Sequence, residues 1–347
     1  MRADRPAERV ASSSQRRGRR VGIYLARLSA GLVVLAVLFR VFDGRTVFET
    51  IAGADRSLLV RAWVLAFAGL IGATGVQRVA LRSCGVPIPP STVLKIAYQT
   101  RFFGLFMPGG TNLVVKWYKL SRPLGKASSV LGAMGLSRTL LNLALVAFAV
   151  AGVWLDARFP WKGLRWAILA FGVLSTVPIG FLVSRRLNRW GGATAKRIWA
   201  ALPVPGRSRE RLEATSLFTE GIRHLRGREI ALLLFLLLLT NTAHILKHVH
   251  ICRAVGIEMD AVAFAWIRGV ILVCAMAPFT LAGLGVREAS LAGLLLSYGV
   301  PEEKTIAYSL LFFAAFVLVE GLIGGALEWI DLLRGGRRGA TGGPGET

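Results

Sequence analysis

The chain has 347 residues, 54% of them hydrophobic, and its mean hydropathy is +0.56. These values argue against a soluble globular protein and are typical of a membrane protein with several spans. The formal net charge is +24. Because the basic residues alternate with apolar runs of bilayer length, we expect no nucleic-acid partner. The charge gathers in the N-terminal tail, in residues 185–228 and at the C-terminus, as expected for cytoplasmic segments.

The first part of the chain predicts a tail, two crossings and a shorter pair of helices. Residues 1–20 are rich in Arg and Ser without apolar periodicity, so we predict a disordered basic tail. Residues 21–42 and 58–81 are long enough to cross a bilayer. A shorter run, 91–107, stops at a Pro-Gly-Gly break, and a second short helix follows as far as Leu120. Since basic residues come next, we expect the chain to return to the cytoplasm through a re-entrant hairpin.

The second part of the chain also predicts crossings and a re-entrant hairpin. Further crossings are predicted at residues 127–155, 164–184, 229–253 and 304–332. Residues 185–228 form a basic cytoplasmic loop between two of these crossings. Two short apolar segments, 261–277 and 283–298, are divided by a break at Pro278. The positions of the basic residues require both short segments to enter and leave from the outer side, as a second re-entrant hairpin.

This order of elements predicts an internal repeat. An Arg-x-x-Gly motif ends the span before each hairpin, with its glycine at Gly85 and at Gly256. The two units cover residues 58–155 and 229–332, and their hairpins enter from opposite sides. Paired interrupted helices in two inverted halves are typical of transporters that bind substrate near the membrane midplane.

The predicted fold is therefore an all-α polytopic membrane protein. It has about six transmembrane helices plus two re-entrant helical hairpins in an inverted repeat. Residues 21–332 form this domain, residues 333–347 form a disordered tail, and both termini are cytoplasmic.

The segment after the second apolar run, Pro278-Phe-Thr-Leu-Ala-Gly283-Leu-Gly285-Val-Arg287-Glu288, resembles the lysylphosphatidylglycerol synthase transmembrane family. The break at Pro108-Gly109-Gly110, followed by Lys116 and then Arg138, is similar to that family too. The resemblance implies a flippase-like protein of the bacterial plasma membrane. It covers the membrane module alone, so we do not expect the aminoacyl transfer of the bifunctional synthases.

The chain departs from the family pattern at three places. Asn112-Leu113 stands where many members carry a glycine and an acidic residue, and Lys116 stands where many carry an arginine. Ser137 occupies a position that is often Glu. The acidic part of the first motif is therefore missing.

Charged residues inside apolar segments are candidate site residues, because a charge in the bilayer is costly unless it has a partner or a function. Arg287 and Glu288 follow the second break, and Glu320 in the last span is the predicted partner of Arg287. Free N–H groups at the helix starts after the glycines suit an anionic headgroup. The predicted headgroup-binding residues are Pro108, Gly109, Gly110, Lys116, Arg138, Asn142, Pro278, Gly283, Gly285, Arg287, Glu288 and Glu320.

Structural roles are the alternative for these residues. Arg287 also fits an ion pair that locks the hairpin, Arg138 and Asn142 fit helix packing, and Lys116 fits a positive-inside charge. His244, His248 and His250 lack the spacing of a metal site, so we predict no metal and no other cofactor.

The predicted function is translocation of an anionic phospholipid or a lipid-linked intermediate between leaflets, without catalysis. One alternative is a membrane-embedded transferase acting on a polyprenyl-phosphate substrate, which would need a carboxylate such as Asp43, Asp55, Asp156 or Glu288. Another is a non-transporting partner of a complex that makes envelope glycans or lipids.

Overall fold

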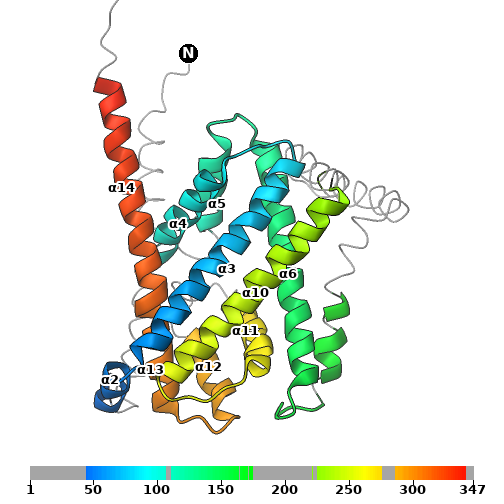
Figure 1. The fold of residues 1–347 in the computed structure, drawn as a ribbon, viewed down its shortest axis with the longest axis vertical. Coiled ribbons are helices and arrows are strands. Elements are labelled where there is room, and N and C mark those ends of the chain that lie inside the picture. Colours follow the sequence, from blue (N-terminus) through cyan, green and yellow to red (C-terminus); the bar gives the residue numbers. More distant parts are fainter. Residues whose placement is uncertain are drawn as a thin grey trace, which may run out of the picture.

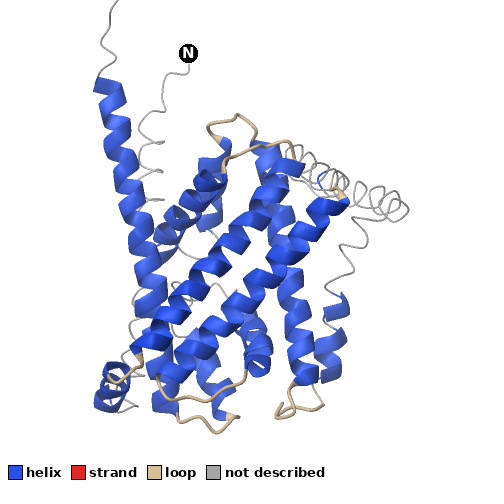
Figure 2. Cartoon of the chain, in the orientation of Figure 1, coloured by secondary structure: helices blue, strands red, loops and turns tan. Residues whose placement is uncertain are grey.

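The computed structural model describes residues 44–106, 111–163, 165–170, 172–174, 221, 225–275 and 286–340. Within these ranges every element is a helix and no strand occurs (Figure 2). Four helical segments of this part are long and apolar enough to cross a bilayer, namely Arg56–Ser83, Ala127–Leu155, Gly227–Ala254 and Glu302–Leu333. The prediction of an all-α polytopic membrane protein is therefore confirmed.

The long helices begin and end close to the predicted boundaries. Helix α3 covers Arg56–Ser83, α6 covers Ala127–Leu155 and α10 covers Gly227–Ala254. The count of six crossings stays a prediction. Residues 21–42 lie outside the described part of the chain, and the segment 164–184 is described only in part, up to residue 174.

Asp55 fixes the start of α3. Its carboxylate accepts hydrogen bonds from the backbone N–H groups of Ser57 at 2.7 Å and Leu58 at 3.4 Å. Such a cap satisfies donors that have no partner within the helix. Hydrogen bonding by the Ser57 side chain and backbone lowers the pKa of the Asp55 carboxyl below its ordinary value. Asp55 thus has a structural role at a helix start.

Two pairs of shorter helices lie at opposite ends of the molecule (Figure 1). The first pair is α4 (Pro90–Phe106) and α5 (Thr111–Ser121), and the second is α11 (Ala261–Ala275) and α12 (Val286–Leu296). Even α4, with 17 residues, is about 26 Å long, short of a hydrocarbon core of about 30 Å.

The breaks inside both pairs, residues 107–110 and 276–285, are outside the described residues, so the re-entrant path stays a prediction. The same holds for six predicted site residues: Pro108, Gly109, Gly110, Pro278, Gly283 and Gly285.

The last span departs from a regular α-helix. It consists of α13 (Glu302–Phe312), a π-helical turn η1 (Phe313–Leu318) and α14 (Val319–Ala340). π-Helical turns are rare and often occur at functional sites. Residues 333–340, expected in the C-terminal tail, are helical. The structure also contains a helix for which the sequence analysis gave no element, α2 (Gly44–Ala52), which packs on α13.

The ends of α3 and α10 have the same local structure, as the predicted repeat requires. Gly85 and Gly256 have φ angles of 73° and 71°, which glycine adopts without steric cost. In both turns the N–H after the glycine donates to the carbonyl five residues earlier, at 2.8 and 2.9 Å. Each glycine carbonyl then accepts from a lysine at the start of a later span, Lys126 at 2.9 Å and Lys304 at 3.0 Å.

The contacts between helices also correspond in the two predicted repeat units. Helices α3 and α10 pack side by side through the middle of the molecule (Figure 1), α4 packs on α14, and α11 packs on α6. The first helix of each hairpin thus contacts the last span of the other unit. These matching contacts support the predicted repeat, while the opposite membrane orientation of its units stays a prediction.

Glycines bring these helices close together. A Cβ at Gly72 of α3 would overlap the Thr240 hydroxyl of α10, and a Cβ at Gly324 of α14 would overlap the Tyr98 carbonyl of α4. A Cβ at Gly152 of α6 would stand 2.9 Å from a backbone nitrogen of α11. Small residues at such positions allow the van der Waals contact that associates helices in lipid.

We predict that Gly324→Ala lowers the free energy of unfolding by about 1–3 kcal/mol, because the added methyl group must push α14 away from the α4 backbone. Thermal unfolding of the purified protein in detergent micelles measures the effect. Gly293→Ala in α12 is the matched control, since a Cβ at Gly293 meets no atom within 4 Å. Equal unfolding midpoints for the two variants would contradict close packing of α4 on α14.

Candidate functional site

Basic side chains from four helices gather where the two predicted units meet. They are Arg101 of α4, Lys116 of α5, Arg138 of α6 and Arg268 of α11, and we call them the central basic cluster. Lys116 lies within electrostatic range of both Arg101 and Arg138. His244 of α10 lies within range of Lys247, Arg268 and Arg101. Arg101 is therefore within electrostatic range of both Lys116 and His244.

Arg101 forms an ion pair with Glu320 of α14. An Nη1 atom of Arg101 lies 2.5 Å from a carboxylate oxygen of Glu320, and the side chains are 31% and 15% exposed. This nitrogen has the charge contact with Glu320 but no hydrogen bond, so the interaction is mainly electrostatic. The predicted pairing of Glu320 with Arg287 stays a prediction, because the Arg287 side chain lies outside what the structure describes. Arg101 is a partner of Glu320 that was not predicted from the sequence.

Arg268 is held by an amide. Its guanidinium donates to the side-chain oxygen of Asn241 at 2.9 Å. Asn241 is buried, and its amide nitrogen donates to the Leu237 carbonyl at 2.9 Å, which turns the amide oxygen toward Arg268. This neutral partner positions the guanidinium without compensating its charge, and no ion pair of Arg268 occurs among the described residues.

Lys116 and Arg138 have no ion pair with a carboxylate in the described part of the chain. Lys116 is partly buried, whereas Arg138 is exposed although it lies within a bilayer-length helix. Asn142, one turn further along α6, is partly buried. The central basic cluster is therefore open on its α6 side.

Lys247 of α10 lies beside the π-helical turn. It is 6% exposed, and its ammonium group is 4.7 Å from the ring centre of Phe312 and 5.6 Å from that of Phe316. Cation–π contact of this kind is strongest where water is excluded. The sequence analysis missed Lys247, because a single lysine in an apolar helix gives no sign of aromatic rings 65 residues further along the chain.

The histidines of α10 have separate surroundings. The His248 ring nitrogen lies 2.6 Å from the Tyr308 hydroxyl, and His244 faces Gly69 of α3. Among the described residues, no group of three His, Cys, Asp or Glu side chains is arranged to hold a metal ion.

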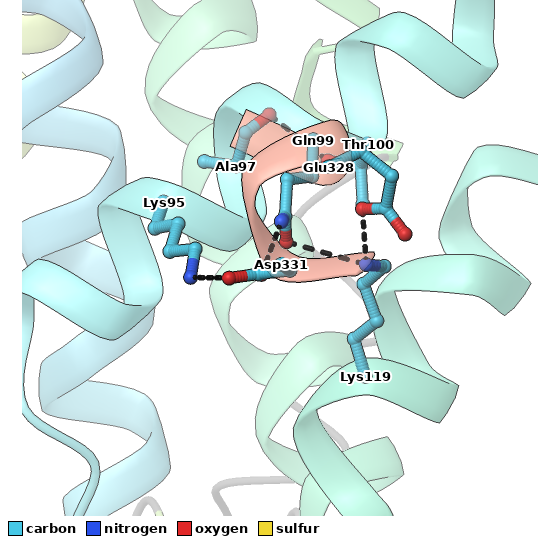
Figure 3. Close-up of polar contacts among 7 residues, drawn as sticks. All are labelled: Lys95, Ala97, Gln99, Thr100, Lys119, Glu328 and Asp331. Carbon is cyan, nitrogen blue, oxygen red and sulfur yellow. Dashed lines mark hydrogen bonds and ion pairs between the residues drawn. The ribbon is translucent and has the colours of Figure 1, made fainter. Parts of the chain in front are cut away.

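A network of ion pairs and hydrogen bonds joins α4 and α5, the first pair of short helices, to α14 (Figure 3). Lys95 of α4 pairs with Asp331, which also accepts from the Gln99 amide at 2.8 Å. Lys119 of α5 pairs with Glu328 at 2.5 Å and donates to the Gln99 oxygen at 3.3 Å. The partners on α14 come more than 200 residues later, so sequence spacing gave no signal for these pairs.

A second polar group lies at the opposite end of the molecule from this network. Asp156, at the end of α6, is buried, and its carboxylate accepts hydrogen bonds from Trp266 at 3.1 Å and from the Tyr298 hydroxyl. The backbone N–H of Arg158 donates to it at 2.9 Å. Asp156, like Asp55, therefore has a structural role. Asp43 lies outside the described residues.

Arg287 and Glu288 belong to the first turn of α12, but their side chains are outside what the structure describes. Of the predicted site residues with described side chains, Lys116 and Arg138 lie together in the central basic cluster, and Glu320 reaches it through Arg101. Arg101 and Arg268 are the additions that only the structure provides.

Bilayer-length helices, paired shorter helices and a basic cluster between them define a polytopic α-helical membrane protein. The chain belongs to the family described as the lysylphosphatidylglycerol synthase TM region, whose model matches residues 22–324. A comparison with curated proteins and one with solved structures found no match.

We predict that Glu320→Gln is more destabilising than Arg101→Gln. Removing the carboxylate leaves Arg101, Lys116 and Arg138 without this counter-charge, whereas removing Arg101 also relieves the repulsion that its cation exerts on Lys116. Breaking a buried pair typically costs about 3–5 kcal/mol, and we expect about 3 for Glu320→Gln because the pair is partly exposed.

Unfolding of both single variants and of the double variant in detergent measures this difference. The double variant is expected to lie between the two single variants. A larger loss of stability for Arg101→Gln would contradict an excess of positive charge at this position.

Proposed function

We propose that the protein moves an anionic phospholipid or a lipid-linked intermediate between the two leaflets of a bacterial plasma membrane. The observation that carries this proposal is the central basic cluster, in which four cationic side chains from four helices have Glu320 as their described ion-pair partner. Isolated charge in a bilayer is costly and marks a substrate path more often than a structural element. An anionic headgroup supplies the missing compensation.

The arrangement gives each residue a role in this cycle. Arg101 and Arg268 present planar donors that suit phosphate oxygens. Arg138 is exposed and Lys116 is partly buried, so a headgroup would enter past Arg138 and reach Lys116. Glu320 holds Arg101 when no substrate is bound, and the headgroup replaces part of that interaction. The helix starts at α5 and α12 add N–H groups suited to a phosphate.

The proposed cycle uses no nucleotide and no catalytic carboxylate. Asp55 caps α3, and Asp156 is bound by Trp266 and Tyr298. Two of the acidic residues that a transferase would need are thereby engaged in structure, which favours translocation over the transferase alternative. We further propose that both termini are cytoplasmic, where the basic segments face anionic lipid.

The experiment uses the purified protein in liposomes that carry a fluorescent phosphatidylglycerol. A membrane-impermeant quencher reports how much labelled lipid stays protected in the inner leaflet. We expect protein-dependent loss of protection. Lys116→Gln should slow it at least about tenfold, since a hydrogen bond to a charged group contributes about 1.5–3 kcal/mol. Arg287→Glu, which reverses a charge in the second hairpin, should abolish it.

Arg158→Gln is the matched control. Arg158 pairs with Asp260 at 2.6 Å outside the central basic cluster, and both side chains are about two-thirds exposed. This variant should translocate lipid at the rate of the unmodified chain. An unchanged protected fraction with unmodified protein would exclude phosphatidylglycerol and leave the lipid-linked intermediate as the substrate to test. The role of the central basic cluster fails if Arg158→Gln slows movement as much as Lys116→Gln does.

A further inference from the structure

We propose that the seam between α14 and the first pair of short helices, α4 and α5, is a gate that opens and closes while lipid moves. This inference rests on the proposed function, because the opened seam gives the headgroup a way out of the central basic cluster. Five side chains join the two sides of the seam, and we call them the gate network: Lys95, Gln99, Lys119, Glu328 and Asp331.

The seam follows one face of α14. Glu320, Gly324 and Glu328 are spaced by four residues and Asp331 follows three residues later, so these positions share a face of the helix. Glu320 pairs with Arg101 of the central basic cluster, and a Cβ at Gly324 would overlap the backbone of α4. The helical rise places Glu328 about 12 Å from Glu320 along α14. The seam therefore leads from the central basic cluster to the gate network.

Gln99 joins the two ion pairs of the gate network into one unit (Figure 3). It is buried, its amide nitrogen donates to Asp331 at 2.8 Å, and its amide oxygen accepts from Lys119 at 3.3 Å. Asp331 also pairs with Lys95, and Lys119 pairs with Glu328 at 2.5 Å. Because Gln99 links the two pairs, loss of one pair weakens the other. The network therefore forms and separates as a unit, as a two-state gate requires.

The exposure of the gate network suits a contact that is broken and remade. Its four charged side chains are between 20% and 37% exposed, so water reaches them and solvates both members of a pair when they separate. Partly exposed ion pairs contribute little net stability, and apolar side chains of similar volume often hold two helices as well or better. Opposite charges still direct the two sides back to the same register when the seam closes.

A hinge for this movement lies at the start of α14. The π-helical turn η1 separates α14 from α13, and helices bend readily at such turns. In the described part of the chain α14 packs mainly on α4, whereas α13 packs on α2 and α12. Bending at η1 therefore moves α14 away from α4 and leaves α13 in place.

Headgroup binding is linked to the gate through Glu320. In the proposed cycle the headgroup takes over part of the interaction between Arg101 and Glu320, which weakens a charge contact across the seam. The gate network then has less support while the site is occupied. Helices α6 and α14 lie on opposite flanks of the molecule (Figure 1). A headgroup that enters past Arg138 of α6 can therefore leave on the other flank, along the opened seam.

The first test measures the distance across the seam by pulsed electron paramagnetic resonance, in the purified full-length protein in lipid nanodiscs. Spin labels are attached at Ser91→Cys near the start of α4 and at Leu332→Cys in α14. Both positions are exposed and lie outside the gate network. The native cysteines Cys84, Cys252 and Cys274 are replaced by alanine.

Removing both carboxylates of the gate network, with Glu328→Gln and Asp331→Asn, should favour the open seam. We expect the share of molecules with a longer distance to rise at least about threefold above a minor state of about 10% or less. Labels at Val64 of α3 and Leu238 of α10, two exposed positions outside the seam, should keep their distance. Arg158→Gln, which removes an exposed ion pair elsewhere, should change neither distance.

A reversible lock tests whether lipid movement needs the gate. Lys119→Cys and Glu328→Cys are joined by a short thiol-reactive linker that a reductant releases, and movement of fluorescent phosphatidylglycerol is followed in liposomes. The linked protein should move lipid at least about tenfold more slowly, because a gating motion limits the rate, and reduction should restore the rate. The linked and reduced forms carry the same substitutions, so loss of the two charges cannot explain the difference. A linker between Arg158→Cys and Asp260→Cys, outside the seam, should not slow movement.

An unchanged distance between α4 and α14 after loss of both carboxylates would overturn the inference and identify the gate network as a static link. Equal lengthening of the distance between α3 and α10 would also overturn it, because it would indicate general unfolding. Movement at full rate in the linked protein would exclude a gate at this seam. The distance measurement involves no lipid movement. If the unmodified protein moves no lipid, the proposed function loses support, whereas the distances still decide whether the seam opens.

Discussion

The ion pair between Arg101 and Glu320 is the interaction on which the rest of the site depends. It joins α4 of the first hairpin to α14 at the end of the second unit, and it provides a carboxylate among four cations. In a low-dielectric environment the mutual repulsion of such cations is strong. Among the described residues this pair is the cluster's ion pair with a carboxylate, and contact with water or an anion would compensate the remaining charge. The proposed anionic lipid headgroup would supply this compensating charge.

Close packing of the helices brings the cationic side chains of the central basic cluster near one another. Glycines on α3, α6 and α14 let the backbones of neighbouring helices approach, and the first helix of each hairpin contacts the last span of the other unit. Arg101 and Lys116 come from the first hairpin, and Arg268 comes from the second. Because the two units interlock, charges separated by more than 100 residues come within electrostatic range of one another. The network of Lys95, Gln99 and Lys119 with α14 holds this arrangement at one end (Figure 3).

The sequence predicted the long helices well because their signals are local. The boundaries of α6 match the predicted range 127–155, and α10 differs from 229–253 by two residues at its start and one at its end. Apolar length and the position of basic residues fix such spans without knowledge of tertiary contacts. Helix α2 and the π-helical turn η1 were missed. A short helix that packs on α13 has no length signal, and a π-helical turn within a continuous apolar span has no signal in length or charge.

By itself, then, the sequence determined the membrane class, most span boundaries, the paired glycine turns at Gly85 and Gly256, and two members of the cluster, Lys116 and Arg138. Only the tertiary structure decided which charges meet. The depth of Glu320 along its span predicted Arg287 as a partner, but depth says nothing about direction around the helix, so the ion pair with Arg101 on α4 could not be predicted from it. Arg101 and Arg268 lie within the short helices α4 and α11. As charges in apolar segments they carried a signal in the sequence, but the sequence did not show which charges lie near them. Their role follows from the packing of α4 on α14 and of α11 on α6, which no local pattern encodes.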